Sequence, residues 1–198
     1  MEYHDIYDKK KNLTGRVNLR GTPMKKGEYG LVVCVWVADG EGNILLTRRA
    51  PEKTFAGTWE NSGGLAQAGE TSRQAIAREL FEETGIRADQ EEFTLIATGR
   101  DRHMYYDYYT IIRDIPIDQI RLLPGETDGV QWASFGQIRQ MIKQKQFCTV
   151  IARQFFRQER KIPGWQTAQK NKGNFVKKFG RFFIAKREDP GYNEKKRF

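Results

Sequence analysis

The sequence contains little cysteine and little histidine, which limits the chemistry open to the protein. Its 198 residues include two cysteines, Cys34 and Cys148, and two histidines, His4 and His103. The cysteines lie far apart and belong to no C-x-x-C motif. Cys34 lies within an apolar run, which favours a buried core thiol, and this cysteine usage suits a reducing compartment, the cytoplasm.

Long apolar stretches are also missing. The N-terminal segment MEYHDIYDKKK has no apolar run of the kind found in signal peptides, and no part of the chain approaches about 18 consecutive apolar residues. The sequence therefore predicts neither export nor a membrane-spanning helix. A hydrophobic fraction of 38% is still enough for a core, and the length fits one domain, or one domain with an appendage.

Positive charge is concentrated at one end of the chain, whose net charge is +9. Residues 1–150 carry 20 Lys and Arg against 21 Asp and Glu, whereas residues 151–198 carry 14 against 4. The basic character therefore belongs to the C-terminal extension and says little about the rest of the protein.

The most informative stretch runs from residue 64 to residue 86, GLAQAGETSRQAIARELFEETGI. Its part from about Ser72 to Thr84 has the pattern of a helix. Thr71 is a residue type that caps helix starts, and Gly85 stands where a C-terminal glycine stop belongs. The sequence therefore predicts one helix with defined ends.

Three carboxylates share one face of this helix. Residues three and four apart lie above one another, so Glu79, Glu82 and Glu83 project together. They repel each other, and a hard divalent cation such as Mg²⁺ or Mn²⁺ relieves that repulsion. A bare acidic run is usually only a solvated face. Here a glycine turn and Glu70 precede the helix, and Arg78 stands beside the first glutamate, which favours a metal site.

The stretch follows the pattern G-x5-E-x7-R-E-U-x-E-E-x-G-U, in which U is aliphatic. Every fixed position is filled, by Gly64, Glu70, Arg78, Glu79, Leu80, Glu82, Glu83, Gly85 and Ile86. This pattern is the Nudix box, and the chain resembles the Nudix hydrolase superfamily. The resemblance implies an α/β/α sandwich with a mixed central sheet. It also implies Mg²⁺- or Mn²⁺-dependent hydrolysis of a small molecule in which a nucleoside diphosphate is linked to another moiety.

The same resemblance assigns roles within the box. The implied metal ligands are one backbone carbonyl and three carboxylates, those of Gly63, Glu79, Glu82 and Glu83. Arg78 would pair with Glu70 and orient the glutamates of the helix, as residues behind metal ligands commonly do.

A carboxylate must also accept the proton of the attacking water, and the sequence leaves this choice open. Glu79 is the preferred member of the box. Glu126, with Asp128 behind it, lies in a later loop that carries such a residue in some relatives, although an ordinary acidic turn explains both. Glu60 precedes the box and either binds metal or satisfies the loop backbone.

Candidate substrate contacts lie between a predicted strand, residues 44–47, and the box. Arg48 and Arg49 follow the strand and would bind phosphates, while Phe55 or Trp59 would stack on a ring. The alternative is that one arginine ends the strand in solvent and Trp59 fills the core.

The remaining sequence suggests three regions. Residues 1–27 form an N-terminal arm with short strands near 5–7 and 16–20. The run DIYD…TGRVNLRG…GEYGLVVCVWV, within residues 5–37, resembles the N-terminal part of Nudix proteins related to isopentenyl-diphosphate isomerase. Residues 28–147 form the catalytic domain, with strands over 31–37, 93–100 and 110–112 and a helix over 135–145. The tyrosines that precede residue 110 are expected to pack in the core rather than to bind a ligand.

Residues 148–198 are expected to contain a helix and a basic, aromatic extension. The helix would run from Cys148 to Arg160, with four apolar members, Val150, Ile151, Phe155 and Phe156. The extension beyond it, including Trp165, would either bind nucleic acid or dock on the domain or on a second copy. We favour the docking interpretation.

Two other functions compete with hydrolysis. An isopentenyl-diphosphate isomerase would use a cysteine and clustered histidines, whereas the segment before the box reads Trp59-Glu60-Asn61-Ser62-Gly63-Gly64. A Nudix protein that only binds nucleotide or RNA would have no reason to gather the glutamates. Both alternatives are therefore disfavoured.

Overall fold

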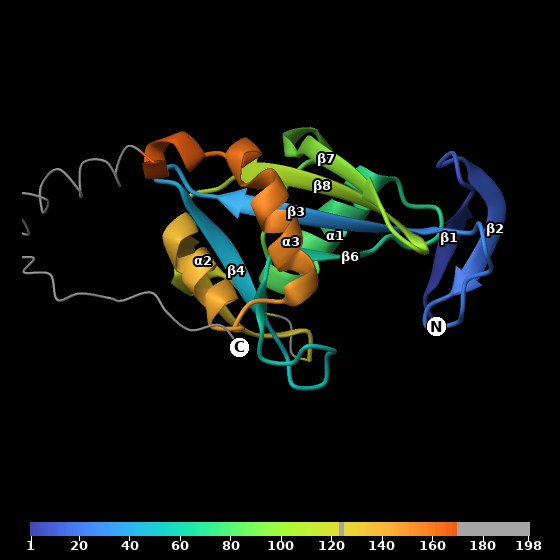
Figure 1. Ribbon diagram of the computed structural model, residues 1–198, viewed down its shortest axis with the longest axis horizontal. Coiled ribbons are helices and arrows are strands. Elements are labelled where there is room, and N and C mark those ends of the chain that lie inside the picture. The colour runs from blue at the N-terminus through green and yellow to red at the C-terminus, as the bar shows by residue number, and fades with distance from the viewer. Residues whose placement is uncertain (123–124, 170–198) are drawn as a thin grey trace, which may run out of the picture.

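The computed structural model describes residues 1–122 and 125–169 and shows a mixed α/β fold (Figure 1). A seven-stranded sheet forms its centre, with α1 behind it and α3 in front of it in the view of Figure 1. This arrangement confirms the expected sandwich with a mixed sheet. No described helix has the length and apolar character needed to cross a membrane.

The central strand β3 (Gly30–Ala38) organises the sheet. It pairs in parallel with β8 (Met104–Ile112) along its whole length and antiparallel with β6 (Ser62–Leu65). Strand β4 (Asn43–Arg49) pairs with β3 only at its start and then leaves it to join β5 (Trp59–Glu60) and β9 (Thr127–Ser134). Strand β7 (Thr94–Arg100) forms the far edge.

Helices α1 (Ser72–Thr84), α2 (Phe135–Lys143) and α3 (Thr149–Gln158) cover the sheet. Short 3₁₀ turns follow or connect them at Gln90–Glu92, Ile117–Gln119 and Glu159–Lys161. The expected helix over 135–145 is thus two residues shorter than predicted. The tyrosines and the strand after them form one continuous strand, β8.

The core has two halves because β3 is buried on both faces. Val33 and Val35 face the helix α1 and its Ile76, in a cluster on one side of the sheet. Trp36 faces the other side, where it packs with Phe155 of α3 and with residues of α2. The continuous apolar run of the sequence therefore forms a strand buried on both faces, as expected.

The N-terminal arm is a hairpin of β1 (Tyr3–Tyr7) and β2 (Leu13–Leu19), separate from the main sheet. It is tied to the loop that precedes α1. Tyr3 O accepts a hydrogen bond from the Ala68 amide at 2.8 Å, and the Asp5 carboxylate accepts one from the Gly69 amide at 2.8 Å. In the turn of the hairpin, Lys11 pairs with the buried Asp107 of β8 at 2.5 Å.

Helix α3 packs differently from the expected amphipathic helix. Phe155 is completely buried, but Val150 and Phe156 are 47% and 51% exposed, so these two were wrongly assigned to the apolar face. A buried Gln158 takes part instead, and its side-chain oxygen accepts a hydrogen bond from Trp36 Nε1 at 2.8 Å. The apolar periodicity of the helix could not predict this contact, because the donor, Trp36, lies on the distant strand β3.

Trp165 does not belong to an accessible tail. Its ring packs edge-on against Phe135 with centroids 5.1 Å apart, and the guanidinium of Arg139 lies over it. Trp165 is therefore part of the second half of the core. The rest of the basic extension, residues 170–198, lies outside the described residues, and the boundary expected at residue 147 stays a prediction.

The packing of α3 leads to a stability prediction. Phe155→Ala should lower the free energy of unfolding by about 3–5 kcal/mol, because it leaves a cavity between α3 and Trp36. Phe156→Ala, its exposed neighbour, should change that free energy by about 0.5 kcal/mol or less. Urea unfolding of both variants measures the difference, and equal losses would contradict the burial of Phe155.

Candidate active site

Local interactions fix both ends of α1, which presents the carboxylates. At the start, Thr71 Oγ1 accepts from the Gln74 amide and the Gln74 side chain accepts from the Thr71 amide, a capping box. At the end, Gly85 adopts a left-handed conformation with φ of 72°. Ile76 and Leu80 are completely buried under the sheet, and Glu83, three residues after Leu80, is buried with them, whereas the side chain of Glu82 is 42% exposed.

These glutamates line a cavity of about 260 Å³, called here the central cavity. Its walls come from the N-terminal hairpin, β4 and the loop after it, β5, β6, α1 and the loop before β9. The lining residues are Glu2, Arg20, Arg49, Lys53, Thr54, Glu60, Gly63, Gly64, Arg78, Glu79, Glu82, Glu83 and Glu126. Six carboxylates and four basic side chains therefore meet in one small space.

Gly64 is required by the close approach of Glu79. A Cβ at residue 64 would overlap the carboxylate of Glu79, so any other residue would force the Glu79 side chain to move. The glycine turn thus brings the backbone of β6 directly against the first helix glutamate. The glycine that the box requires at residue 64 is therefore explained by the space that the Glu79 carboxylate occupies.

Arg78 holds the acidic groups together. Its Nε and Nη2 donate to the two oxygens of Glu70 at 2.7 and 3.0 Å, and its Nη1 donates to Glu79 at 2.9 Å and to Glu82 at 2.8 Å. Although burial acts against it, the hydrogen bonds from Arg78 and from the Gln67 amide lower the pKa of Glu70. The guanidinium therefore orients two helix glutamates from one fixed position.

Glu83 lies deepest and remains unsatisfied. Its side chain is buried, and Oε2 has no hydrogen-bond partner among the described residues. Burial, followed by the nearby carboxylates of Glu60 and Glu79, raises the pKa of Glu83 well above its usual value. An unpartnered oxygen at this position fits a divalent cation, which would supply both the missing contact and the missing charge.

The carboxylates are not yet arranged around a common point. In the described residues, no three Asp, Glu, His or Cys side chains already form a set that could hold a metal. Arg78 instead draws Glu79 and Glu82 to itself. Cation binding would therefore require these side chains to turn from the guanidinium.

Two further acids of the central cavity are each paired with a base. Glu60 accepts a hydrogen bond from Arg49 Nη1 at 2.6 Å. Burial raises the pKa of Glu60 by more than Arg49 lowers it. Glu126 pairs with Lys53. The structure therefore brings Glu60, Glu126 and Arg49 to the box, together with Lys53, which the sequence did not single out.

Three of the predicted substrate contacts lie elsewhere. Arg48 pairs with Asp128 at 2.7 Å, and its guanidinium lies 5.7 Å from the centroid of Trp59. Phe55 is 52% exposed on the loop after β4. Because neighbouring residues on a strand point to opposite faces, Arg49 enters the central cavity and Arg48 does not.

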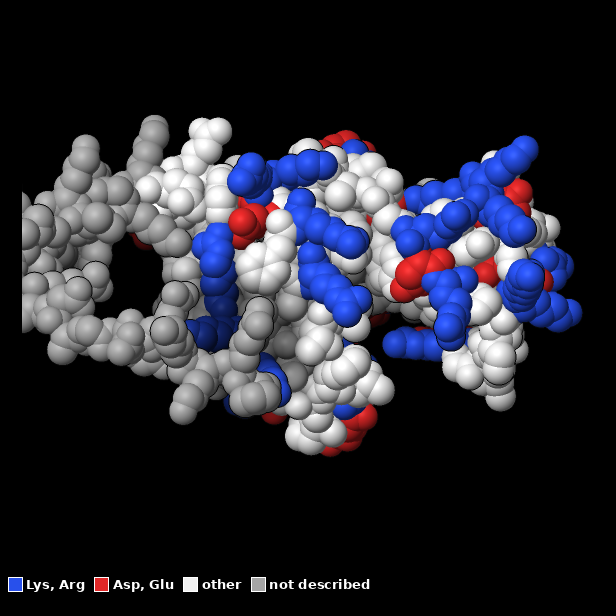
Figure 2. All heavy atoms as spheres, viewed as in Figure 1, with Lys and Arg blue, Asp and Glu red and all other residues white. Residues whose placement is uncertain are grey.

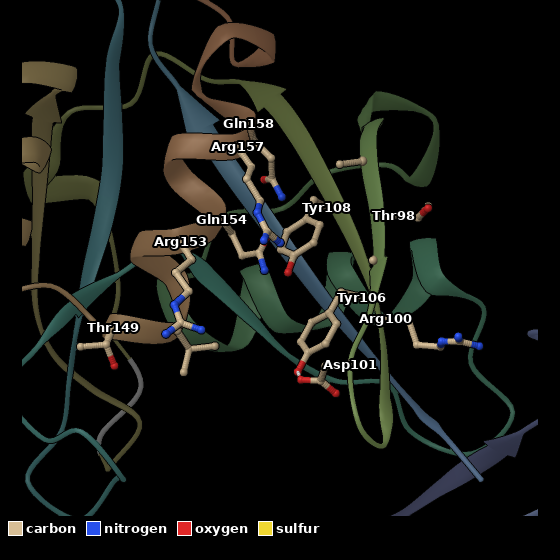
Figure 3. A pocket seen from close by; sticks show the side chains of 13 residues that line it. Thr98, Arg100, Asp101, Tyr106, Tyr108, Thr149, Arg153, Gln154, Arg157 and Gln158 are labelled. Atoms are coloured by element: carbon tan, nitrogen blue, oxygen red, sulfur yellow. Dashed lines mark hydrogen bonds between the residues drawn. The ribbon is translucent and has the colours of Figure 1, made fainter. Parts of the chain in front are cut away.

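A second, larger hollow lies between the sheet and α3 and is called here the tyrosine cleft (Figure 3). It measures about 560 Å³. The rings of Tyr106 and Tyr108 line it in a stacked pair, 8° from parallel with centroids 6.0 Å apart. Arg153 and Arg157 of α3 face them, and neither forms an ion pair within residues 1–122 and 125–169. Figure 2 shows Lys and Arg side chains across this face of the molecule.

The tyrosine cleft lies on the face of the sheet that α3 covers, opposite to the face that α1 covers. Gly63, Cys34 and Tyr108 occupy one row across three adjacent strands, so about 10 Å of sheet separates Gly63 from Tyr108. The tyrosines were expected to pack in the core, and Tyr105, Tyr108 and Tyr109 are buried, whereas Tyr106 is half-buried and lines the cleft.

Comparisons with known proteins agree with this geometry. The family model described as NUDIX domain matches residues 28–153. An uncharacterized Nudix hydrolase of Listeria monocytogenes is 31% identical over 124 residues, which cover 62% of this chain and 73% of the relative. A CTP pyrophosphohydrolase of Escherichia coli is 42% identical over 73 residues, 35% of this chain and 54% of that protein. A crystal structure from Deinococcus radiodurans shares the fold, with a TM-score of 0.67, 20% identity and coverage of 79% of this chain and 98% of that one.

The contact between Arg78 and Glu70 can be measured by a double-mutant cycle. Arg78→Ala and Glu70→Ala should each lower the free energy of unfolding, and the double variant should be little worse than either, with a coupling of about 0.5–3 kcal/mol. The exposed pair Arg48 and Asp128 is the control, with an expected coupling of about 0–1 kcal/mol. Fully additive losses at Arg78 and Glu70 would contradict the pairing.

The burial of Glu83 predicts a stabilising substitution. In the folded protein its pKa is raised above the unfolded value of about 4.3, so folding is penalised increasingly as the pH rises above that value. Without metal at pH 7.5, Glu83→Gln should therefore raise Tm, by about 2–4 °C for each kcal/mol of penalty removed. The exposed Glu91→Gln is the control.

Mg²⁺ completes this test, because it stabilises only a folded protein that binds it. It should raise the Tm of the wild type more than that of Glu83→Gln. A Tm that is the same in both proteins without metal, and an identical response to Mg²⁺, would contradict the account of Glu83.

Proposed function

The chain belongs to the Nudix hydrolase family, and we propose that it is a Mg²⁺- or Mn²⁺-dependent pyrophosphohydrolase acting on a nucleoside diphosphate linked to another moiety. The observation that carries this proposal is the burial of Glu83 beside Glu79 and Glu60, with one carboxylate oxygen that has no partner in the part of the chain that the structure describes. Isolated buried carboxylates are costly, so their gathering in one cavity calls for a cation.

The residues that would hold the metal are those expected from the box: Glu79, Glu82, Glu83 and the carbonyl of Gly63. All four line the central cavity. When bound, such ions supply positive charge to phosphate oxygens and make water easier to deprotonate. Arg78, fixed by Glu70, would hold Glu79 and Glu82 until a cation takes its place as their partner.

The other side chains of the central cavity suit a diphosphate. Arg49 and Lys53 each hold a carboxylate that they can exchange for a phosphate oxygen, a contact that guanidinium and ammonium groups make well. Burial raises the pKa of Glu79, which makes its carboxylate a better proton acceptor. Glu79 is thus our candidate for the base, while Glu126 is engaged by Lys53.

The tyrosine cleft would take the part of the substrate beyond the diphosphate. Stacked aromatic rings and unpaired arginines suit a flat, polar ring such as a nucleobase. The relationship to a CTP pyrophosphohydrolase supports a nucleotide as one half of the substrate. The half-buried Tyr106, supported by the buried Tyr108 beside it, would then be the aromatic contact in place of Phe55 and Trp59.

Neither alternative function gains support. Among the described residues that line the central cavity there is no cysteine and no histidine, which an isomerase of the related kind would use. Cys34 lies behind Gly63, completely enclosed, and burial raises the pKa of its thiol. A protein that only binds nucleotides would not need the costly burial of Glu83.

Removal of single ligands tests the proposal. Glu82→Gln and Glu83→Gln should each lower kcat by about 10²–10⁴ with Mg²⁺, because each removes a charge felt mainly in the transition state. The assay is a panel of ADP-ribose, nucleotide sugars, dinucleoside polyphosphates, coenzyme A, oxidised nucleotides and capped RNA, with identification of the products. Glu91→Gln is the control, and near-normal turnover by both cavity variants would contradict the metal site.

A further inference from the structure

The N-terminal hairpin contributes two charged residues to the central cavity. Glu2, just before β1, and Arg20, just after β2, both line it together with the glutamates of α1. Their side chains form an ion pair and are 51% and 53% exposed, so they stand at the mouth of the cavity. Neither residue belongs to the box or to the region that matches the NUDIX domain family model.

The hairpin is held in this position by backbone contacts. The Arg20 amide donates to Glu2 O at 2.9 Å, which closes the ends of the two strands. Strand β1 is in turn hydrogen-bonded to Ala68 and Gly69, which immediately precede Glu70. Arg20 is therefore placed by the same loop that leads into the box and is not a freely moving surface arginine.

Arg20 differs from the other basic residues of the central cavity. Arg49, Lys53 and Arg78 each neutralise a carboxylate from the cavity walls of the catalytic domain. Arg20 pairs with Glu2 of its own hairpin, and the negative charges of Glu2, and then of Glu79 and Glu126, raise its pKa. Its guanidinium thus lines the same cavity as Glu79, Glu82 and Glu83, but among the described residues it pairs with none of them.

We propose that Arg20 binds a phosphate oxygen of the substrate diphosphate, and that Glu2 holds the guanidinium ready when no substrate is present. This inference rests on the proposed function, whose substrates all contain a diphosphate. An exposed ion pair contributes little to the free energy of folding, so Arg20 can exchange Glu2 for a phosphate at little cost. A guanidinium also offers phosphate two parallel hydrogen bonds. The hairpin would thereby become part of the binding site.

The chain provides a matched control for Arg20. Arg16 lies on the same hairpin and is also exposed, with an ion pair to Glu28 at 2.7 Å, but it does not line the central cavity. Loss of Arg16 removes the same charge and the same type of ion pair from the same element. A loss of binding that follows removal of Arg20 but not of Arg16 is therefore due to the place of Arg20 in the central cavity.

The test measures binding of methylenediphosphonate, a diphosphate analogue that cannot be hydrolysed, by calorimetry with saturating Mg²⁺. Arg20→Gln should weaken binding about 10- to 100-fold, the range expected for a hydrogen bond to a charged group. Arg20→Lys should recover part of the loss, because an ammonium keeps the charge without the paired geometry. Arg16→Gln should bind as the wild type does.

Glu2→Gln separates phosphate binding from a purely structural pair. It keeps Arg20 but removes its partner, so binding should equal or exceed that of the wild type. If Glu2→Gln loses as much affinity as Arg20→Gln, or if Arg20→Gln binds like Arg16→Gln, the proposal is overturned. A wild type that does not bind the analogue also overturns it. Hydrolysis of the diphosphate panel decides the proposed function independently of these results.

Discussion

The crowding of carboxylates in the central cavity is the constraint on which the rest of the structure depends. Glu60 and Glu83 are buried and Glu79 is half-buried beside them, so burial and mutual repulsion raise the pKa of Glu83 well above normal. Folding must offset this repulsion with interactions elsewhere, because an unpaired buried charge is among the most costly features of a protein. The structure accepts this cost where a bound cation would remove it.

Several features can be understood as responses to this constraint. Arg78 pairs with Glu70, Glu79 and Glu82 from one position, and its single positive charge offsets part of their repulsion, while the fully buried Leu80 anchors the helix. The capping box and the left-handed Gly85 define the length of α1 and so the rotation of its acidic face. The absence of a side chain at Gly64 lets the sheet approach that face. A site under internal repulsion thus rests on a rigid, well-packed support.

Much of this site was predictable from the sequence because its signals are local. The ends of α1 follow from Thr71 and Gly85, which act within one turn of the helix, and the shared face of Glu79, Glu82 and Glu83 follows from helical spacing alone. The double burial of β3 follows from its unbroken apolar run. Each of these predictions required information from only a few neighbouring residues.

The remainder depends on contacts between distant segments. Arg20 reaches the central cavity because β1 pairs with the loop before α1, more than 60 residues along the chain. Gln158 is buried, while Val150 and Phe156 are exposed, and its side chain accepts the hydrogen bond that the buried Trp36 donates. The tyrosine cleft is formed jointly by side chains of β7, β8 and α3, elements that lie far apart along the chain. Patterns of spacing along one element contain none of this information.

The central claim is that the buried carboxylates of α1 exist to hold a divalent cation. Anomalous diffraction from crystals of the wild-type protein soaked with Mn²⁺ tests it most directly. The account predicts an anomalous peak in the central cavity within about 2.0–2.4 Å of carboxylate oxygens from at least two of Glu79, Glu82 and Glu83. A cavity without such a peak, in which Arg78 keeps its hydrogen bonds to Glu79 and Glu82 and Glu83 remains without a partner, would contradict it.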